Sequence, residues 1–200
     1  KDRTAAFEAL KLIETENTWS NLALGKVLKA SGADQPFVRE LVYGILRNRL
    51  LIDHTIDGYL KKPHLRTAER ILLRMGVYQL CFMDSVTPYA AVNETVELAR
   101  QKARGSEGFI NGVLRAFLRD GARLQVPEIS EALAPKELAR RLSLKYSVSL
   151  WIVRLWLRSY GLQQTEAMLK ASLFPAPLTL RANCAKITRD ALIEELKKQG

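Results

Sequence analysis

The sequence lacks most of the residues from which metal sites, disulfide frameworks and catalytic centres are built. Its 200 residues include two cysteines, Cys81 and Cys184, and two histidines, His54 and His64. Cysteines this far apart, without clustered histidines, argue against both a disulfide framework and a zinc site. The chain also has no Gly-rich phosphate loop, no Gly-x-Gly-x-x-Gly motif and no Cys-x-x-Cys motif. We therefore predict no catalytic residue and no metal ligand in it.

Long hydrophobic runs are also missing. Arg74 and Arg154 interrupt the longest apolar stretches, and the first residues do not have the pattern of a signal peptide. We expect a cytoplasmic protein without a membrane partner. The chain is rich in positive charge instead, with 31 basic against 21 acidic residues and a net charge of +10. This balance favours an anionic partner, of which nucleic acid is the simplest.

Apolar residues recur at helical spacing through most of the chain. The predicted helices cover residues 2–15, 18–31, 35–60 with a break near His54, 67–83, 88–103 and 106–120. Residues 122–134 are predicted to be a connector, and two or three further helices follow, including 147–160 and 163–172. Trp151, Trp156 and Tyr160 lie at helical spacing and are expected in the core. The fold class is mainly α, a helical bundle followed by further helices.

The pattern changes near the C-terminus. In residues 175–183, a segment bounded by prolines, apolar and polar side chains alternate, and this pattern predicts a strand. Residues 188–200 predict an amphipathic helix with Lys197 and Lys198 in its last turn. One strand cannot satisfy its own backbone, so it needs sheet partners from outside this sequence. We expect the start of a small α/β unit, and hence a fragment of a longer protein.

The segment 108–119 combines a turn dipeptide, Asn111-Gly112, with apolar residues at helical spacing, and the periodicity favours a helix. On that helix Gly108 and Gly112 share an arc with Arg115 and Arg119. Glycines here would let a backbone approach closely, either an RNA strand or a neighbouring helix. Residues 98–124 contain six basic and two acidic residues, a net +4 that suits phosphate binding.

Two further patterns have simpler interpretations. Gly44-Ile-Leu-Arg47 repeats the pattern of Gly112-Val-Leu-Arg115, which is typical of helices that cross closely at glycine. Glu94 interrupts an apolar helical run without a second carboxylate or a histidine at useful spacing. We predict that Glu94 is buried and structural, paired with an arginine of the neighbouring helix, with Arg74 as the best candidate.

Several segments together resemble a NusB-type RNA-binding domain over about residues 1–121. They are Arg3 with Ala6, Glu40-Leu-Val-Tyr-Gly-Ile-Leu-Arg47, Ile71-Leu-Leu-Arg-Met-Gly-Val-Tyr-Gln-Leu80, Ala90-Ala-Val-Asn-Glu-Thr-Val-Glu-Leu-Ala99 and Gly108-Phe-Ile-Asn-Gly-Val-Leu-Arg115. The continuation, with residues 151–161 and Leu180-Arg-Ala-Asn183, is similar to the N-terminal part of the bacterial Sun/Fmu/RsmB family. That family methylates carbon 5 of a cytosine in small-subunit ribosomal RNA with S-adenosylmethionine.

The resemblance implies three parts: an RNA-binding helical domain at 1–125, a helical connector at 126–174, and the start of an α/β domain at 175–200. It places the S-adenosylmethionine site and both working cysteines in a downstream methyltransferase domain, so no cofactor is expected in this stretch. The partner would be ribosomal RNA. The expected RNA contacts are Arg3, Arg47, Lys102, Arg104, Arg115 and Arg119.

Two other functions remain open on the sequence. One is a free antitermination factor of the NusB type, against which the predicted strand and helix at 178–200 argue. The other is a helical protein-interaction module whose basic face keeps it soluble. The target nucleotide, the oligomeric state and any contact with a ribosomal protein are also open.

Overall fold

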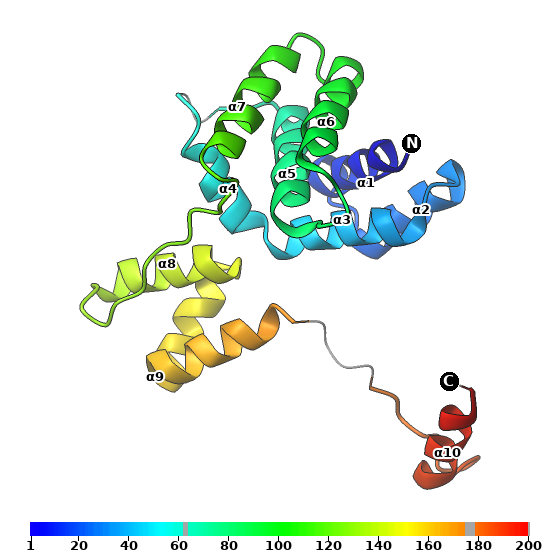
Figure 1. Ribbon diagram of the computed structural model, residues 1–200. Coiled ribbons are helices and arrows are strands. Elements are labelled where there is room, and N and C mark those ends of the chain that lie inside the picture. The colour runs from blue at the N-terminus through cyan, green and yellow to red at the C-terminus, as the bar shows by residue number, and fades with distance from the viewer. Residues whose placement is uncertain (62–63, 175–178, 200) are drawn as a thin grey trace.

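The structure, a computed structural model, describes residues 1–61, 64–174 and 179–199, and all regular structure in these ranges is helical. Figure 1 shows the ten helices of this part of the chain. They are α1 (Asp2–Glu16), α2 (Ser20–Ser31), α3 (Gln35–Arg47), α4 (Arg49–Asp57), α5 (Thr67–Phe82), α6 (Pro88–Lys102), α7 (Glu107–Arg119), α8 (Pro135–Tyr146), α9 (Leu150–Ser172) and α10 (Arg189–Gln199). The mainly α prediction is confirmed. None of these helices combines the length and apolar character needed to cross a membrane.

Helix α5 is the centre of a bundle made by α1 to α7 (Figure 1). Residues 71–79 of α5 are all buried, and α1, α3, α4, α6 and α7 pack around it. A helix buried on every side is expected in the middle of a bundle. Gly76 allows a close approach of α7, because a Cβ atom there would lie 2.7 Å from the methyl carbons of Leu114.

Helix α7 confirms that periodicity outweighs the Asn111-Gly112 turn signal. Ile110, Val113, Leu114 and Phe117 are buried on its inner face. Both residues of the dipeptide lie within the continuous helix and outside that buried face. The free energy of burying four large side chains exceeds the roughly 1 kcal/mol that a helical glycine costs relative to alanine.

The break in the predicted helix 35–60 lies at Asn48, between α3 and α4, and not near His54, which is inside α4. The side-chain amide of Asn48 donates a hydrogen bond to the carbonyl of Gly44 at 2.9 Å. Asparagine side chains compete in this way for backbone groups that a continuing helix would use. The backbone of Asn48 has φ −108° and ψ 13°, so the next helix starts in a new direction.

Helices α8 and α9 form a second, smaller core that contains Ala139, Leu142, Tyr146, Val153 and Leu169. This unit packs against α4, where the backbone N–H of Leu51 donates to Oγ of Ser147 at 3.1 Å. The predicted helices 147–160 and 163–172 are the two halves of α9, which Gly161 interrupts with φ 71° and ψ 179°.

The expected core positions of Trp151 and Tyr160 are wrong. Trp151 is 68% exposed and Tyr160 is 56% exposed, whereas Trp156 packs against the second core. The buried face of the first half of α9 is set by Val153, which lies two residues, or about 200°, from Trp151. Trp151 therefore faces away from that buried side, whereas Tyr160 is exposed at the end of this half, next to Gly161.

The predicted strand at 175–183 falls partly on residues 175–178, which lie outside the described residues. Residues 179–183 do not form a strand. A strand requires a neighbour to accept its backbone hydrogen bonds. Helix α10 follows, with Lys197 and Lys198 in its last turn as predicted, and Figure 1 shows it apart from the other helices.

Candidate nucleic-acid interface

Helices α6 and α7 form an antiparallel hairpin, because only the short turn at 103–106 joins them. Two open grooves flank α7. The first, here called the arginine groove, has a volume of about 660 Å³ and runs between α6 and α7. Its lining is Pro88, Tyr89, Val92, Asn93, Val96, Arg100, Asn111, Arg115, Leu118 and Arg119. Three arginines and no carboxylate line this surface, so it attracts anions.

The second groove, here called the glycine groove, has a volume of about 590 Å³ and lies on the other side of α7. Gly108 and Gly112 line it together with Phe109, Lys61 and His64, among others. A Cβ atom at either glycine would meet nothing within 4 Å. The two glycines therefore do not mark a helix crossing.

Gly44 behaves in the opposite way, although it occupies the matching place in the repeated Gly-aliphatic-Leu-Arg pattern. A Cβ atom at Gly44 would collide with the ring and hydroxyl of Tyr78. Gly44 is therefore a point of close approach between α3 and α5, as a crossing of helices predicts. The hydroxyl of Tyr78 donates to Glu40 at 2.6 Å, and burial together with this carboxylate raises the pKa of Tyr78.

Of the six residues expected to bind RNA, Arg115 and Arg119 are brought together in the arginine groove. Both are exposed, and Nε of Arg115 donates to Oδ1 of Asn111 at 2.9 Å. That contact orients the guanidinium without neutralising it. Arg104 is exposed in the turn between α6 and α7, close in sequence to both helices.

The other three expected residues lie outside both grooves. Arg47 is exposed in the last turn of α3. Lys102 is 2.5 Å from the carboxylate of Glu8, and Arg3 lies 4.0 Å from that of Glu94. The two ion pairs join α1 to α6, so these two cations already have protein partners.

Arg3 is held on several sides. Its Nε donates to Oε1 of Gln79 at 2.6 Å, and its guanidinium lies 5.4 Å from the ring centre of Phe37. Burial lowers the pKa of Arg3, and the nearby carboxylates of Glu94 and Asp2 oppose that shift. The contacts give Arg3 a structural role in the α1, α3 and α5 packing.

The prediction that Glu94 is buried and pairs with Arg74 is wrong, although Glu94 does pair with an arginine of another helix. The side chain of Glu94 is 53% exposed, and its partner is Arg3 of α1 and not Arg74. Glu94 follows Asn93 on the outer face of α6, whereas the inner face is formed by Ala91, Val92 and Thr95. An apolar sequence neighbourhood does not show which side of the helix a given residue occupies.

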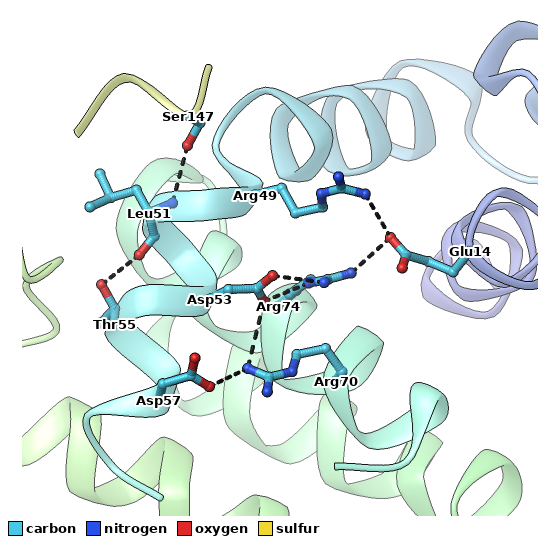
Figure 2. A network of polar contacts seen from close by, with 9 residues as sticks. All are labelled: Glu14, Arg49, Leu51, Asp53, Thr55, Asp57, Arg70, Arg74 and Ser147. Carbon is cyan, nitrogen blue, oxygen red and sulfur yellow. Dashed lines mark hydrogen bonds and ion pairs between the residues drawn. The ribbon is translucent and has the colours of Figure 1, made fainter. Parts of the chain in front are cut away.

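Arg74 is indeed buried, in the network of polar contacts that Figure 2 shows. Its guanidinium donates two hydrogen bonds to Asp53 on α4, and Nη1 donates to Oε1 of Glu14 on α1 at 3.0 Å. Burial alone would lower the pKa of Arg74, but the hydrogen bonds and charges of Asp53 and Glu14 raise it. The network joins α1, α4 and α5 and fixes the scaffold beneath the α6–α7 hairpin.

Four residues that line the arginine groove were not among the expected RNA contacts: Tyr89, Asn93, Arg100 and Asn111. One face of α6 carries Tyr89, Asn93, Val96 and Arg100 at helical spacing. This spacing is the only feature of the sequence that could have indicated that they lie together. These α6 residues face Asn111, Arg115 and Arg119 of α7 only because the two helices pack side by side, a property of the folded bundle.

The described residues contain no group of three or more His, Cys, Asp or Glu side chains placed to hold a metal ion. Cys81 is half-buried beside the carbonyl of Ala122, and burial raises the pKa of its thiol to about 12. A thiol of this kind is a poor nucleophile at neutral pH. Cys184 is exposed.

Comparison with known proteins identifies the bundle. The model of the NusB family matches residues 1–119. The chain belongs to the NusB family. The transcription antitermination protein NusB of Bacillus licheniformis is 35% identical over 127 residues, which are 60% of this chain and 98% of that protein. A second model, the ferredoxin-like domain of RsmF/B-like methyltransferases, matches residues 148–200, beyond the NusB region.

Relatives that match nearly the whole chain are named as methyltransferases. The probable ribosomal RNA small subunit methyltransferase B of Bacillus subtilis is 34% identical over 205 residues. That alignment covers 99% of this chain and 44% of the relative. The ribosomal RNA small subunit methyltransferase B of Vibrio cholerae is 30% identical over 96% of this chain and 43% of its own length. The chain thus spans less than half the length of these relatives.

Proposed function

We propose that this chain is the RNA-binding N-terminal region of an S-adenosylmethionine-dependent ribosomal RNA cytosine-C5 methyltransferase. The observation that carries the proposal is the match to a methyltransferase B relative over 99% of the chain. Along this chain the NusB region comes first and the RsmF/B-like region follows it. The net charge of +10 supports an anionic partner. The region anchors small-subunit ribosomal RNA while another domain carries out methyl transfer.

The RNA contacts in this proposal come first from Arg115 and Arg119, with Arg104 at the neighbouring turn. Their exposure and the lack of carboxylates in the groove lining support this assignment. Arg3, Arg47 and Lys102 contribute less, because two of them are already paired and Arg47 lies on α3. Phosphate contacts of this kind position RNA without reading its sequence.

Residues 1–125 act as the RNA-binding domain, residues 126–174 as the helical connector, and residues 175–200 as the start of an α/β domain that leads to the methyltransferase domain. S-adenosylmethionine binds in that last domain, outside this chain. The parent enzyme works in the cytoplasm, where ribosomal RNA is modified. A base within folded RNA must leave its stack before carbon 5 can react, so a separate anchoring region has a clear use.

A free antitermination factor is the second candidate, because the Bacillus licheniformis NusB protein matches 60% of this chain along nearly its entire length. The match to the NusB model ends at residue 119, before the region similar to RsmF/B-like proteins, which begins at residue 148. The methyltransferase proposal accounts for both regions.

The test compares small-subunit ribosomal RNA from cells with and without the gene by bisulfite sequencing. We expect one cytosine, protected by methylation in normal cells, to lose its protection when the gene is deleted. The purified 200-residue chain alone should bind the RNA but transfer no methyl group. Unchanged protection in the deletion strain would contradict the proposal and leave the antitermination role.

A further inference from the structure

Helix α4 is capped by a residue far away in the sequence. The first amides of a helix lack a partner within it, and the side chain of the preceding residue usually supplies one. Asn48 occupies that place, but its amide donates back to the carbonyl of Gly44 and makes no cap. The backbone N–H of Leu51, in the first turn of α4, donates instead to Oγ of Ser147 at 3.1 Å (Figure 2).

The backbone of Ser147 has a conformation that favours glycine. Ser147 follows α8 with φ 52° and ψ 35°, the left-handed conformation in which many helices end, usually at glycine. A Cβ atom raises the energy of this conformation. Glycine would therefore suit the end of α8 better, but it has no hydroxyl to accept the N–H of Leu51.

A second hydrogen bond fixes the segment before α8 to the same helix. Thr55 is fully buried, and its hydroxyl donates to the carbonyl of Leu51 at 2.9 Å. The same oxygen accepts the backbone N–H of Gln125 at 3.0 Å. A Cβ atom at Gly58, just after α4, would lie 2.7 Å from Oε1 of Gln125, so the missing side chain allows close packing there. We call the contacts of Leu51, Thr55, Gln125 and Ser147 the α4 clamp.

The opposite face of α4 is bound to the centre of the bundle. At 100° per residue, Asp53 lies about 200° from Leu51, and Asp57 lies about 200° from Thr55. Both carboxylates form ion pairs with arginines of α5 (Figure 2). Helix α4 thus joins the central helix on one side to the segments that flank α8 on the other.

The second core extends this connection to the end of α9. Val153 from the first half of α9 and Leu169 from the second half both belong to the core shared with α8, on either side of the break at Gly161. The contacts that fix the end of α8 at Ser147 therefore also fix the direction in which the chain leaves α9.

We propose that Thr55 and Ser147 are positioning residues for the methyl-transfer reaction. Through the α4 clamp they hold α8 and α9 in one orientation on the bundle, and so set the place of the methyltransferase domain relative to the anchored RNA. The inference rests on the proposed function and adds residues that act on the reaction from outside the RNA surface. A displacement of about 1 Å at the reacting groups can lower a rate about 100-fold.

The test measures kcat and the KM for small-subunit ribosomal RNA with the full-length enzyme, well below the melting temperature of each variant. Ser147→Gly suits the left-handed backbone but removes the acceptor, so kcat should fall by about 10- to 100-fold while KM stays within about twofold. Ser147→Asn should retain most of the activity, because asparagine tolerates this backbone and its Oδ1 can accept the N–H of Leu51.

Thr55→Val and Thr95→Val are a matched pair. Both threonines are buried and donate to the carbonyl four residues earlier, whereas Thr55 also accepts the N–H of Gln125. Thr55→Val should lower kcat as Ser147→Gly does, and Thr95→Val should leave it unchanged.

A wild-type kcat in Ser147→Gly and Thr55→Val would overturn this inference. A raised KM at unchanged kcat would also overturn it, because the clamp would then act on RNA binding. Equal losses in Ser147→Gly and Ser147→Asn would show that the hydrogen bond to Leu51 is not the cause. A full-length wild type that transfers no methyl group to this RNA would instead remove the proposed function.

Discussion

The guanidinium of Arg74 donates two parallel hydrogen bonds to the carboxylate of Asp53, from Nε at 2.7 Å and from Nη2 at 2.8 Å. Arg74 lies on the central helix α5 and Asp53 on α4, so the pair connects the centre of the bundle to the helix that supports α8 (Figure 2). This two-bond geometry is the strongest form of a carboxylate–guanidinium contact.

Asp53→Asn should lower the free energy of unfolding by about 3–5 kcal/mol, because the buried guanidinium of Arg74 loses its main counter-charge. Urea denaturation followed by circular dichroism measures the effect. Glu97→Gln is the control, since its pair with Arg100 is exposed and exposed pairs contribute less than about 1 kcal/mol. Equal small losses in both variants would show that the network does not stabilise the bundle.

The two glycines of the repeated pattern should respond in opposite directions. Gly44→Ala forces Tyr78 or the α3 backbone to move, so it should cost about 1–3 kcal/mol as an overpacked core position. Gly112→Ala adds a methyl group to an open helix position and should stabilise the protein by up to about 1 kcal/mol. Thermal unfolding of both variants measures the contrast. A destabilising Gly112→Ala would mean that α7 has a neighbour there.

Glu166 on α9 should make the second core sensitive to acid. Hydrogen bonds from Lys145 at 2.9 Å and from Tyr146 at 2.8 Å hold the pKa of Glu166 below its usual value of 4.5. A lowered pKa in the folded state gives stability that is fully present above pH 4.5 and is lost as the pH falls through the folded pKa. The gain is at most about 1 kcal/mol, because water screens the pair.

Glu166→Gln therefore should be less stable than the wild type at neutral pH, and the difference should disappear below the folded pKa of Glu166. Denaturation across the acid range measures the two curves. Parallel curves, with a constant difference at every pH, would show that the carboxylate charge does not contribute.

The sequence predicts those helices whose formation depends on the local spacing of apolar residues. Helix α7 has four buried residues at helical spacing, and this pattern identified it despite Asn111-Gly112. The break at Asn48 was misplaced, because it depends on whether one amide side chain takes a backbone carbonyl.

Partners across helices could not be derived in the same way. Glu94 pairs with Arg3, ninety-one residues away in sequence, and Arg74 pairs with Asp53 and Glu14. Each partner depends on which helix faces are neighbours, a property of the assembled bundle. The arginine groove is similar: the α7 arginines were found from their sequence cluster, whereas Tyr89 and Asn93 become relevant only because α6 lies beside α7.

The salt dependence of small-subunit ribosomal RNA binding tests most directly whether Arg115 and Arg119 contact RNA phosphates. The measurement compares the wild type with Arg115→Ala/Arg119→Ala. Each phosphate contact of a single strand contributes about 0.7 to the slope of log affinity against log salt, so loss of two contacts should flatten the slope by about 1.4 and weaken binding at low salt. Arg154→Ala/Arg158→Ala removes the same charge from exposed positions on α9 and should change the slope less. A groove variant that binds like the wild type at low and moderate salt would contradict the assignment of this surface to RNA.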